Sequence, residues 1–252
     1  MAQPYDQFIL FGDSLTQMSS SQEDGFGYQP ALQDAYGRRL DVINRGFSGY
    51  TTANALKVLP KFFPSPRTAT VRFLAIFLGC NDACDPGMSQ HVRLDTFKHN
   101  LKRIIQHPAV QAHDPRIFLI TPPPVNEYQL EAFDASEGVS HPSRTAARTR
   151  KYAEVALEVG SELDVPVVDL WSAFMHSVGW RRQQQGDHPL IGSRDLPNLA
   201  EFAALFTDGL HPTGKGYRIQ YDAVMKTIRR TWPDQAPERL DMVFEDWRVA
   251  PV

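Results

Sequence analysis

The sequence predicts an α/β fold built on a central parallel sheet. Short apolar runs alternate with longer amphipathic segments along the chain, and the runs contain little polar alternation. Strands that are buried on both faces by helices have this nearly continuous apolar composition. The chain has 252 residues, of which 42% are hydrophobic and 22% are charged. These values suit a globular protein with a sizeable core and exclude a disordered or fibrous chain.

The expected strands and helices follow one another in alternation. The strands are rich in Ile, Val, Leu and Phe and are expected at residues 8–11, 41–44, 71–78, 117–121 and 165–169. The helices are expected at residues 28–36, 52–62, 94–107, 143–163 and 215–232, with Ser143 as the N-cap of the fourth. Such repetition predicts one domain with helices on both faces of the sheet and right-handed crossovers.

Two segments interrupt the alternation. Residues 181–198 are polar and contain Gly and Pro, which predicts a surface loop. Residues 233–252 form a tail with three prolines and with aromatic residues that include Trp247. We expect this tail either to pack on the domain formed by residues 1–232 or to act as the arm of a homodimer, because exposed Trp and Phe are unfavourable.

Composition and motifs exclude several classes of protein. With 26 basic and 29 acidic residues, a net charge of −3 and no long basic run, a nucleic-acid binder or polybasic membrane binder is not expected. Cys80 and Cys84 make neither a disulfide-rich scaffold nor a zinc site. No signal peptide and no apolar run of about 18 residues is recognisable, so we expect a cytoplasmic protein without stable membrane insertion. No nucleotide-binding or metal motif appears, so neither a cofactor nor a metal is expected.

Polar residues follow the strands at the edge where parallel sheets form their sites. Ligands bind outside the carboxyl ends of such strands. The segments at this edge are Gly12-Asp13-Ser14, Gly46-Phe47-Ser48-Gly49-Tyr50, Gly79-Cys80-Asn81-Asp82 and, before the last helix, Asp208-Gly209-Leu210-His211. We expect Asp13 and Asp82 to accept backbone N–H groups in their tight loops.

These residue types suffice for acyl transfer. A serine such as Ser14 is a poor nucleophile unless a base removes its proton. His211 can be that base if Asp208, three residues earlier, holds its other ring nitrogen. An oxyanion needs preorganised donors, for which the backbone N–H groups of Ser14 and Gly46 and the side-chain amide of Asn81 are candidates. Glycine at position 46 would let the backbone approach a substrate closely.

The four blocks resemble those of the GDSL (SGNH) hydrolases in order and spacing, and the resemblance spans roughly residues 6–230. Residues 44–50, 121–124 and 208–211 are similar to the isoamyl-acetate-hydrolysing esterase group. The resemblance implies a three-layer α/β/α, flavodoxin-like fold with about five parallel strands. It also implies a triad of Ser14, His211 and Asp208, and an oxyanion hole that includes Gly46 and Asn81. Cys80 stands where the family would have a small residue such as Ala.

The predicted function is therefore a metal-independent serine esterase that acts on a small-molecule, short-chain, acetate-type ester through an acyl-enzyme. A thioesterase or lysophospholipase could use the same triad. A non-catalytic flavodoxin-like module that binds a nucleotide or anion is a further alternative, although Asp13 would repel phosphate. Ser48 is a rival nucleophile that lacks its own Asp-x-x-His and more simply serves a turn. The candidates for the wall of a small substrate pocket are Phe26, Phe47, Tyr50 and Pro123.

Overall fold

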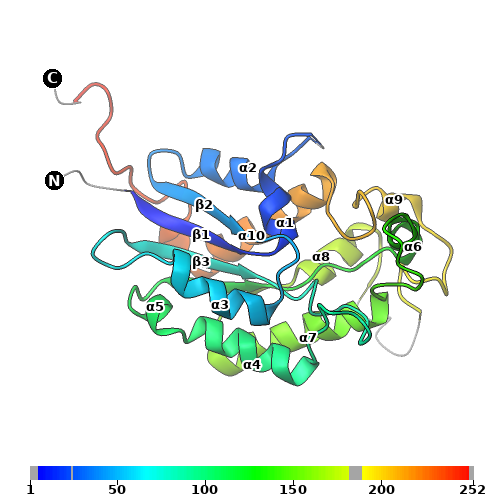
Figure 1. The fold of residues 1–252 in the computed structure, drawn as a ribbon. Helices are drawn as coiled ribbons and strands as arrows, with labels where there is room; N and C mark the ends of the chain where they lie inside the picture. The colour runs from blue at the N-terminus through cyan, green and yellow to red at the C-terminus, as the bar shows by residue number, and fades with distance from the viewer. Residues whose placement is uncertain (1–4, 24, 182–188, 250–252) are drawn as a thin grey trace.

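The computed structural model describes residues 5–23, 25–181 and 189–249, and a parallel sheet runs through its centre (Figure 1). The strands are β1 (Asp6–Gly12), β2 (Leu40–Gly46), β3 (Val71–Phe77), β4 (Arg116–Ile120) and β5 (Val167–Val168). Their order is β2-β1-β3-β4-β5, and every neighbouring pair is parallel. In a sheet of this order, the site forms where the order reverses, between β1 and β3.

Helices cover both faces of the sheet. One layer contains α3 (Thr52–Phe62), α4 (Leu94–Ile105) and α7 (Ala146–Leu163), which lie together below the sheet in Figure 1. The other layer contains α2 (Tyr28–Ala35), α8 (Leu170–Ser177) and α10 (Gly214–Thr231). Successive side chains of a strand point to opposite faces. In β1, Ile9 and Phe11 therefore pack in the first layer, and Phe8 and Leu10 pack in the second. The predicted three-layer α/β/α fold is confirmed.

Several short elements have no counterpart in the prediction. They are α1 (Ser14–Gln17), η1 (Met18–Ser20), α5 (Pro108–Gln111), α6 (Glu127–Ser136), α9 (Ala200–Ala203) and η3 (Pro233–Gln235), together with α8. Asn126 caps α6 by accepting from the Tyr128 N–H at 3.0 Å. Asp169, expected at the end of a strand, instead caps α8 by accepting from the Ser172 N–H at 3.0 Å, so the fifth strand is shorter than predicted.

The predicted N-cap of α7 was wrong. Thr145 caps this helix, because its Oγ1 accepts from the Arg148 N–H at 3.2 Å. Ser143 precedes the cap in an irregular segment, where its N–H donates to Asp134 Oδ2 at 2.7 Å. Residues 143–145, which were expected to begin the helix, are therefore non-helical, and they include Arg144.

The C-terminal tail contacts the segment that follows α2. Tyr36 Oη donates to Gln235 O at 3.0 Å, Arg39 Nε donates to Leu240 O at 2.8 Å, and Val243 N donates to Arg38 O at 2.9 Å. Of the loop expected at 181–198, residues 182–188 lie outside the described residues. Within the described ranges, no helix has both the length and the apolar character needed to cross a membrane.

Candidate active site

Ser14 stands at the junction of β1 and α1. β1 ends at Gly12, and Asp13 caps α1 by accepting from the Leu15 N–H at 3.0 Å. A Cβ at Gly12 would lie 2.1 Å from Thr16 Oγ1, so the turn from strand to helix requires glycine there. Since Ser14 is the first residue of α1, its N–H has no acceptor within the helix. The turn therefore holds the hydroxyl and this N–H at the carboxyl end of β1.

Asp208 and His211 belong to a tight loop that precedes α10. Phe206 and Pro212 form an antiparallel bridge across its base, and the Thr207 N–H donates to His211 O at 2.9 Å. Asp208 Oδ1 accepts from the backbone N–H groups of Leu210 at 2.9 Å and His211 at 2.8 Å. The carboxylate is thereby fixed with its second oxygen free to meet the imidazole ring.

Ser14, His211 and Asp208 form one hydrogen-bonded chain. His211 Nε2 lies 2.9 Å from Ser14 Oγ, across 197 residues of sequence, and His211 Nδ1 lies 2.6 Å from Asp208 Oδ2. The His211 and Asp208 side chains are only 17% and 18% exposed. Burial alone would raise the pKa of Asp208, but the hydrogen bonds and charge of His211 hold it below its ordinary value. An ionised Asp208 accepts from Nδ1–H, which leaves Nε2 to accept the serine proton.

Asn81 follows β3 and lies beside the loop after β2. Its Nδ2 donates to Tyr50 O at 2.9 Å, and its Oδ1 accepts from Arg144 Nη2 at 3.0 Å. An amide carries two donor hydrogens, so one remains for a substrate oxygen. Arg144 was not foreseen from the sequence. It stands 63 residues from Asn81, and no local pattern around residues 143–146 signals the contact.

Gly46 is tightly packed for a reason that the sequence did not indicate. A Cβ at this position would lie 2.0 Å from Gln17 N and 2.5 Å from Gln17 Cα. The missing side chain thus makes room for the backbone of α1, rather than for a substrate as expected. Its N–H donates to Asn44 Oδ1 at 2.9 Å. The oxyanion role of Gly46 stays a prediction, and it requires this N–H to be shared with or released by Asn44.

Two buried carboxyl groups flank the site. Asp13 is fully buried, and its Oδ2 has no hydrogen-bond partner among the described residues. Burial raises the pKa of Asp13 to about 7. Asp82 accepts from the Thr52 N–H at 3.1 Å and from the Thr52 hydroxyl, and burial raises its pKa to about 6. Asp13 accepts a backbone N–H of its own loop, as expected, whereas the backbone N–H that Asp82 accepts comes from the start of α3, 30 residues away.

The four pocket candidates lie in different surroundings. The rings of Phe47 and Tyr50 stack at 5.2 Å with an interplanar angle of 20°, beside the Asn81 amide that donates to Tyr50 O. Phe26 packs on Tyr221 of α10, against the core between the sheet and the layer of α2, α8 and α10. Pro123 is buried in the segment after β4. Their role as pocket walls stays a prediction.

Ser48 differs from Ser14 in its surroundings. It is exposed, and its N–H donates to Gln17 Oε1 at 2.9 Å. The serine within hydrogen-bonding distance of His211 is Ser14.

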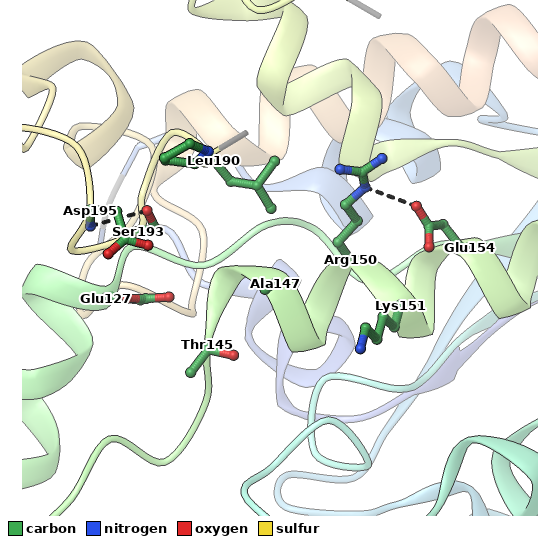
Figure 2. A pocket seen from close by; sticks show the side chains of 10 residues that line it. Glu127, Thr145, Ala147, Arg150, Lys151, Glu154, Leu190, Ser193 and Asp195 are labelled. Atoms are coloured by element: carbon green, nitrogen blue, oxygen red, sulfur yellow. Dashed lines mark hydrogen bonds and ion pairs between the residues drawn. The ribbon is translucent and has the colours of Figure 1, made fainter. Parts of the chain in front are cut away.

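A cavity of about 760 Å³ lies apart from the triad, between the first turns of α7 and residues 189–195. Figure 2 shows Arg150 and Lys151 of α7 on one side of it and Leu190 and Ser193 on the other. Its lining includes none of the triad residues. In the described ranges, no three His, Cys, Asp or Glu side chains are grouped closely enough to hold a metal ion.

Comparison with known proteins gives a consistent result. The model of the GDSL-like lipase/acylhydrolase family matches residues 10–219. The isoamyl acetate-hydrolyzing esterase of Saccharomyces cerevisiae is 32% identical over 250 residues, which are 97% of this chain and 94% of that protein. A GDSL esterase/lipase of Arabidopsis thaliana is 32% identical over 244 residues, covering 92% and 89%. A crystal structure of a lipase/acylhydrolase from Enterococcus faecalis superposes with a TM-score of 0.61 and 25% identity, covering 95% of this chain and all of that one.

Proposed function

The chain belongs to the GDSL-like lipase/acylhydrolase family and is a carboxylic ester hydrolase, and on that premise we propose that it hydrolyses short-chain, acetate-type esters through Ser14, His211 and Asp208. The observation that carries the proposal is the continuous chain of contacts from Ser14 Oγ to His211 at 2.9 Å and from His211 to Asp208 at 2.6 Å. The acetate-type substrate is proposed because the yeast relative, 32% identical over 97% of this chain, is named for hydrolysing isoamyl acetate.

In the first half-reaction, Ser14 Oγ attacks the ester carbonyl carbon while His211 Nε2 takes the hydroxyl proton. Asp208 stabilises the imidazolium through the hydrogen bond at Nδ1 and keeps the ring in the orientation that faces Ser14. The carbonyl oxygen becomes an oxyanion, towards which the Ser14 N–H and the second amide hydrogen of Asn81 donate. Collapse of this intermediate breaks the bond to the alcohol, which leaves with the proton from His211.

In the second half-reaction, a water molecule attacks the acyl group on Ser14. His211 takes a proton from this water, and a second oxyanion forms at the same donors. When that intermediate collapses, the carboxylic acid leaves and the proton returns to Ser14 Oγ. No step requires a metal ion or an organic cofactor.

The test is covalent labelling with a fluorophosphonate probe followed by peptide mapping. We expect a single adduct on Ser14, loss of labelling and of hydrolysis in Ser14→Ala, and normal labelling in the matched variant Ser48→Ala. Thermal unfolding of each variant checks that the fold is retained. Hydrolysis by a folded Ser14→Ala variant, or an adduct on another residue, would reject the proposed mechanism.

We also propose that residues 1–232 form the hydrolase domain and that residues 233–252 are an appended tail. This division rests on the hydrogen bonds by which Gln235, Leu240 and Val243 attach the tail to the segment after α2.

A further inference from the structure

Arg144 is buried without a carboxylate in direct ion-pair contact, and its charge acts on the buried Asp13 only across a longer distance. The residue is 7% exposed, and no ion pair to it occurs within the described part of the chain. Its hydrogen bonds go to neutral oxygens: Nε donates to Cys80 O at 2.7 Å, Nη2 to Asn81 Oδ1 at 3.0 Å and Nη1 to Ser143 Oγ at 3.2 Å. A buried guanidinium without a carboxylate partner is unfavourable for stability. A role in the stability of the fold therefore gives a weak explanation for this residue.

The contact to Asn81 fixes which way its amide points. A guanidinium only donates hydrogen bonds, so the amide atom that faces Arg144 must be the oxygen. A backbone carbonyl only accepts them, so the atom that faces Tyr50 O must be the nitrogen. Both neighbours thus select the same orientation, and the reversed amide would place donor against donor and oxygen against oxygen. The second N–H of Asn81 is left with one defined direction.

Hydrogen bonds to the residues before and after Arg144 fix its backbone in place. The Ser143 N–H donates to Asp134 Oδ2, and the Asp85 N–H donates to Ser143 O, each at 2.7 Å. On the other side, the Ala146 N–H donates to Glu127 Oε1 at 2.7 Å. Figure 2 shows this glutamate beside the start of α7. The arginine is therefore anchored to α6 and α7, and it contacts both the backbone before Asn81 and the Asn81 side chain.

We propose that Arg144 is the positioning residue of the oxyanion site, which holds the Asn81 amide in its donating orientation and polarises it as negative charge develops on the substrate. The inference rests on the proposed function, in which Asn81 is an oxyanion donor. Preorganised donors act mainly in the transition state. Arg144 should therefore affect kcat much more than KM, and it should act only through Asn81.

The test is a double-mutant cycle of Arg144→Met and Asn81→Ala with p-nitrophenyl acetate as substrate. Loss of one oxyanion donor typically lowers kcat by about 10²–10³. We expect Arg144→Met to lower kcat by at least about tenfold and to change KM less than about threefold. In the Asn81→Ala background, the same substitution should lower kcat less than about threefold, because the group that it positions is already gone.

Two further variants keep the test decisive. Arg148→Met removes a guanidinium from the first turn of α7 that pairs with Asp85 instead, and we expect it to retain kcat. Arg144→Lys keeps the charge but cannot span both oxygens with a rigid fork. We expect Arg144→Lys to lower kcat less than Arg144→Met does, and this loss of kcat should also disappear in the Asn81→Ala background. If Arg144→Met does not fold, the cycle with Arg144→Lys replaces it.

Equal losses of kcat in both backgrounds would show a general structural role and overturn the proposal, as would a wild-type kcat in Arg144→Met. A wild-type kcat in Asn81→Ala would also overturn it. Labelling of Ser14 reports separately on the proposed function, because it identifies the nucleophile whatever the role of Asn81.

Discussion

The backbone N–H of Asn126 donates to the carbonyl oxygen of Gly209 at 2.9 Å, and this bond joins the start of α6 to the loop of Asp208 and His211. Asn126 is fully buried, and its Nδ2 also donates to Asn198 Oδ1 at 3.0 Å. Gly209 has φ of +90°, and a Cβ there would lie 2.4 Å from Asn126 O. The geometry of the triad thus depends on a close approach of two backbones that only glycine permits.

We expect Gly209→Ala to impair both stability and catalysis. An alanine at this φ costs about 1–3 kcal/mol of folding free energy, and contact with Asn126 O adds to that. Any outward shift of the loop lengthens the 2.9 Å contact between His211 and Ser14. Since a displacement of about 1 Å at a reacting group can cost about 10²-fold in rate, kcat should fall by at least tenfold. Urea unfolding and steady-state kinetics measure the two effects.

Gly138→Ala is the matched control. Gly138 has φ of +76°, but no atom lies within 4 Å of its Cβ position. The Gly138→Ala variant should lose stability through backbone strain alone, because its new Cβ meets no other atom. We expect its kcat to stay at the wild-type value. If the two variants lose similar stability and both keep wild-type kcat, the contact between Asn126 and Gly209 does not hold the triad in place.

Asp13 makes stability depend on pH with a definite sign. Burial raises its pKa from the ordinary 3.8 to about 7, so between these values the folded state binds a proton that the unfolded state has released. Stability therefore falls as pH rises from about 4 to about 7. One pKa unit corresponds to about 1.4 kcal/mol, so the cost above pH 7 is about 4 kcal/mol. We expect Asp13→Asn, which resembles the protonated acid, to be more stable than wild type at pH 8 and equally stable near pH 4.

Asp85→Asn provides a control of opposite sign. A hydrogen bond from the Gly87 N–H and the charge of Arg148 keep the pKa of Asp85 below its ordinary value. Partial desolvation of the carboxylate acts in the opposite direction but is outweighed. Its carboxylate therefore stabilises the fold above the ordinary pKa, and this contribution is lost as pH falls. Denaturant unfolding from pH 4 to pH 8 compares both variants with wild type. A stability difference for Asp13→Asn that does not vary with pH would contradict the buried, proton-binding state.

The sequence predicted those features that depend on local composition. Buried parallel strands have continuous apolar runs, so β1, β3 and β4 could be located and the layered fold inferred from them. The positions of Ser14 and Asn81 followed from the rule that sites form at strand ends. Asp208 and His211 were chosen instead for their spacing in the segment before the last helix. The structure places Ser14, Asp208 and His211 within hydrogen-bonding distance of one another.

The features that the sequence did not predict depend on contacts between distant segments. Arg144 reaches Asn81 across 63 residues, and the start of α7 is displaced because Asp134 and Asp85 hold Ser143 in a non-helical segment. The packing reason for Gly46 was missed on the same ground, since the group that requires its missing Cβ is the α1 backbone at Gln17, while its oxyanion role stays a prediction. Helix α6 has little apolar periodicity, with only Leu130 and Asp134 buried among its residues.

We propose that the tail mediates a homodimer. Its backbone is attached through Arg38 and Arg39, whereas Trp247 is 75% exposed and Phe244 is 49% exposed. In Figure 1 the tail runs at the end of the molecule where the N-terminus lies. We expect light scattering to detect a dimer of the full chain, and a monomer with unchanged kcat after deletion of residues 241–252. Trp247→Ser should weaken the dimer without affecting unfolding. A monomeric full chain would contradict the dimer and leave the tail as packing on its own domain.

The last prediction concerns the length of the acyl chain. The rings of Phe47 and Tyr50 stack on each other, and the Tyr50 carbonyl accepts from Asn81. Gln90 Nε2 braces their loop by donating to Gly49 O at 2.8 Å. We propose these two rings as the wall of the acyl pocket, and a wall braced in this way would suit a small acyl group and resist expansion. Each methylene that fits contributes about 0.8 kcal/mol, and one that collides costs at least as much. With p-nitrophenyl esters from acetate to palmitate, kcat/KM should peak at roughly two to six carbons and fall more than tenfold before twelve.

Tyr50→Ala tests whether this wall sets the limit, because it removes the ring and keeps the carbonyl that accepts from Asn81. The optimum should move to longer chains, while Phe133→Ala, at an exposed ring of α6, should leave it unchanged. Each ester is assayed below and above its solubility limit. A lipase that works at oil surfaces would gain rate when an emulsion forms, whereas we expect no such gain for the proposed short-chain pocket. A rate that rises towards palmitate, or that jumps at the solubility limit, would therefore show that the acyl chain occupies an extended groove rather than a pocket closed by Tyr50.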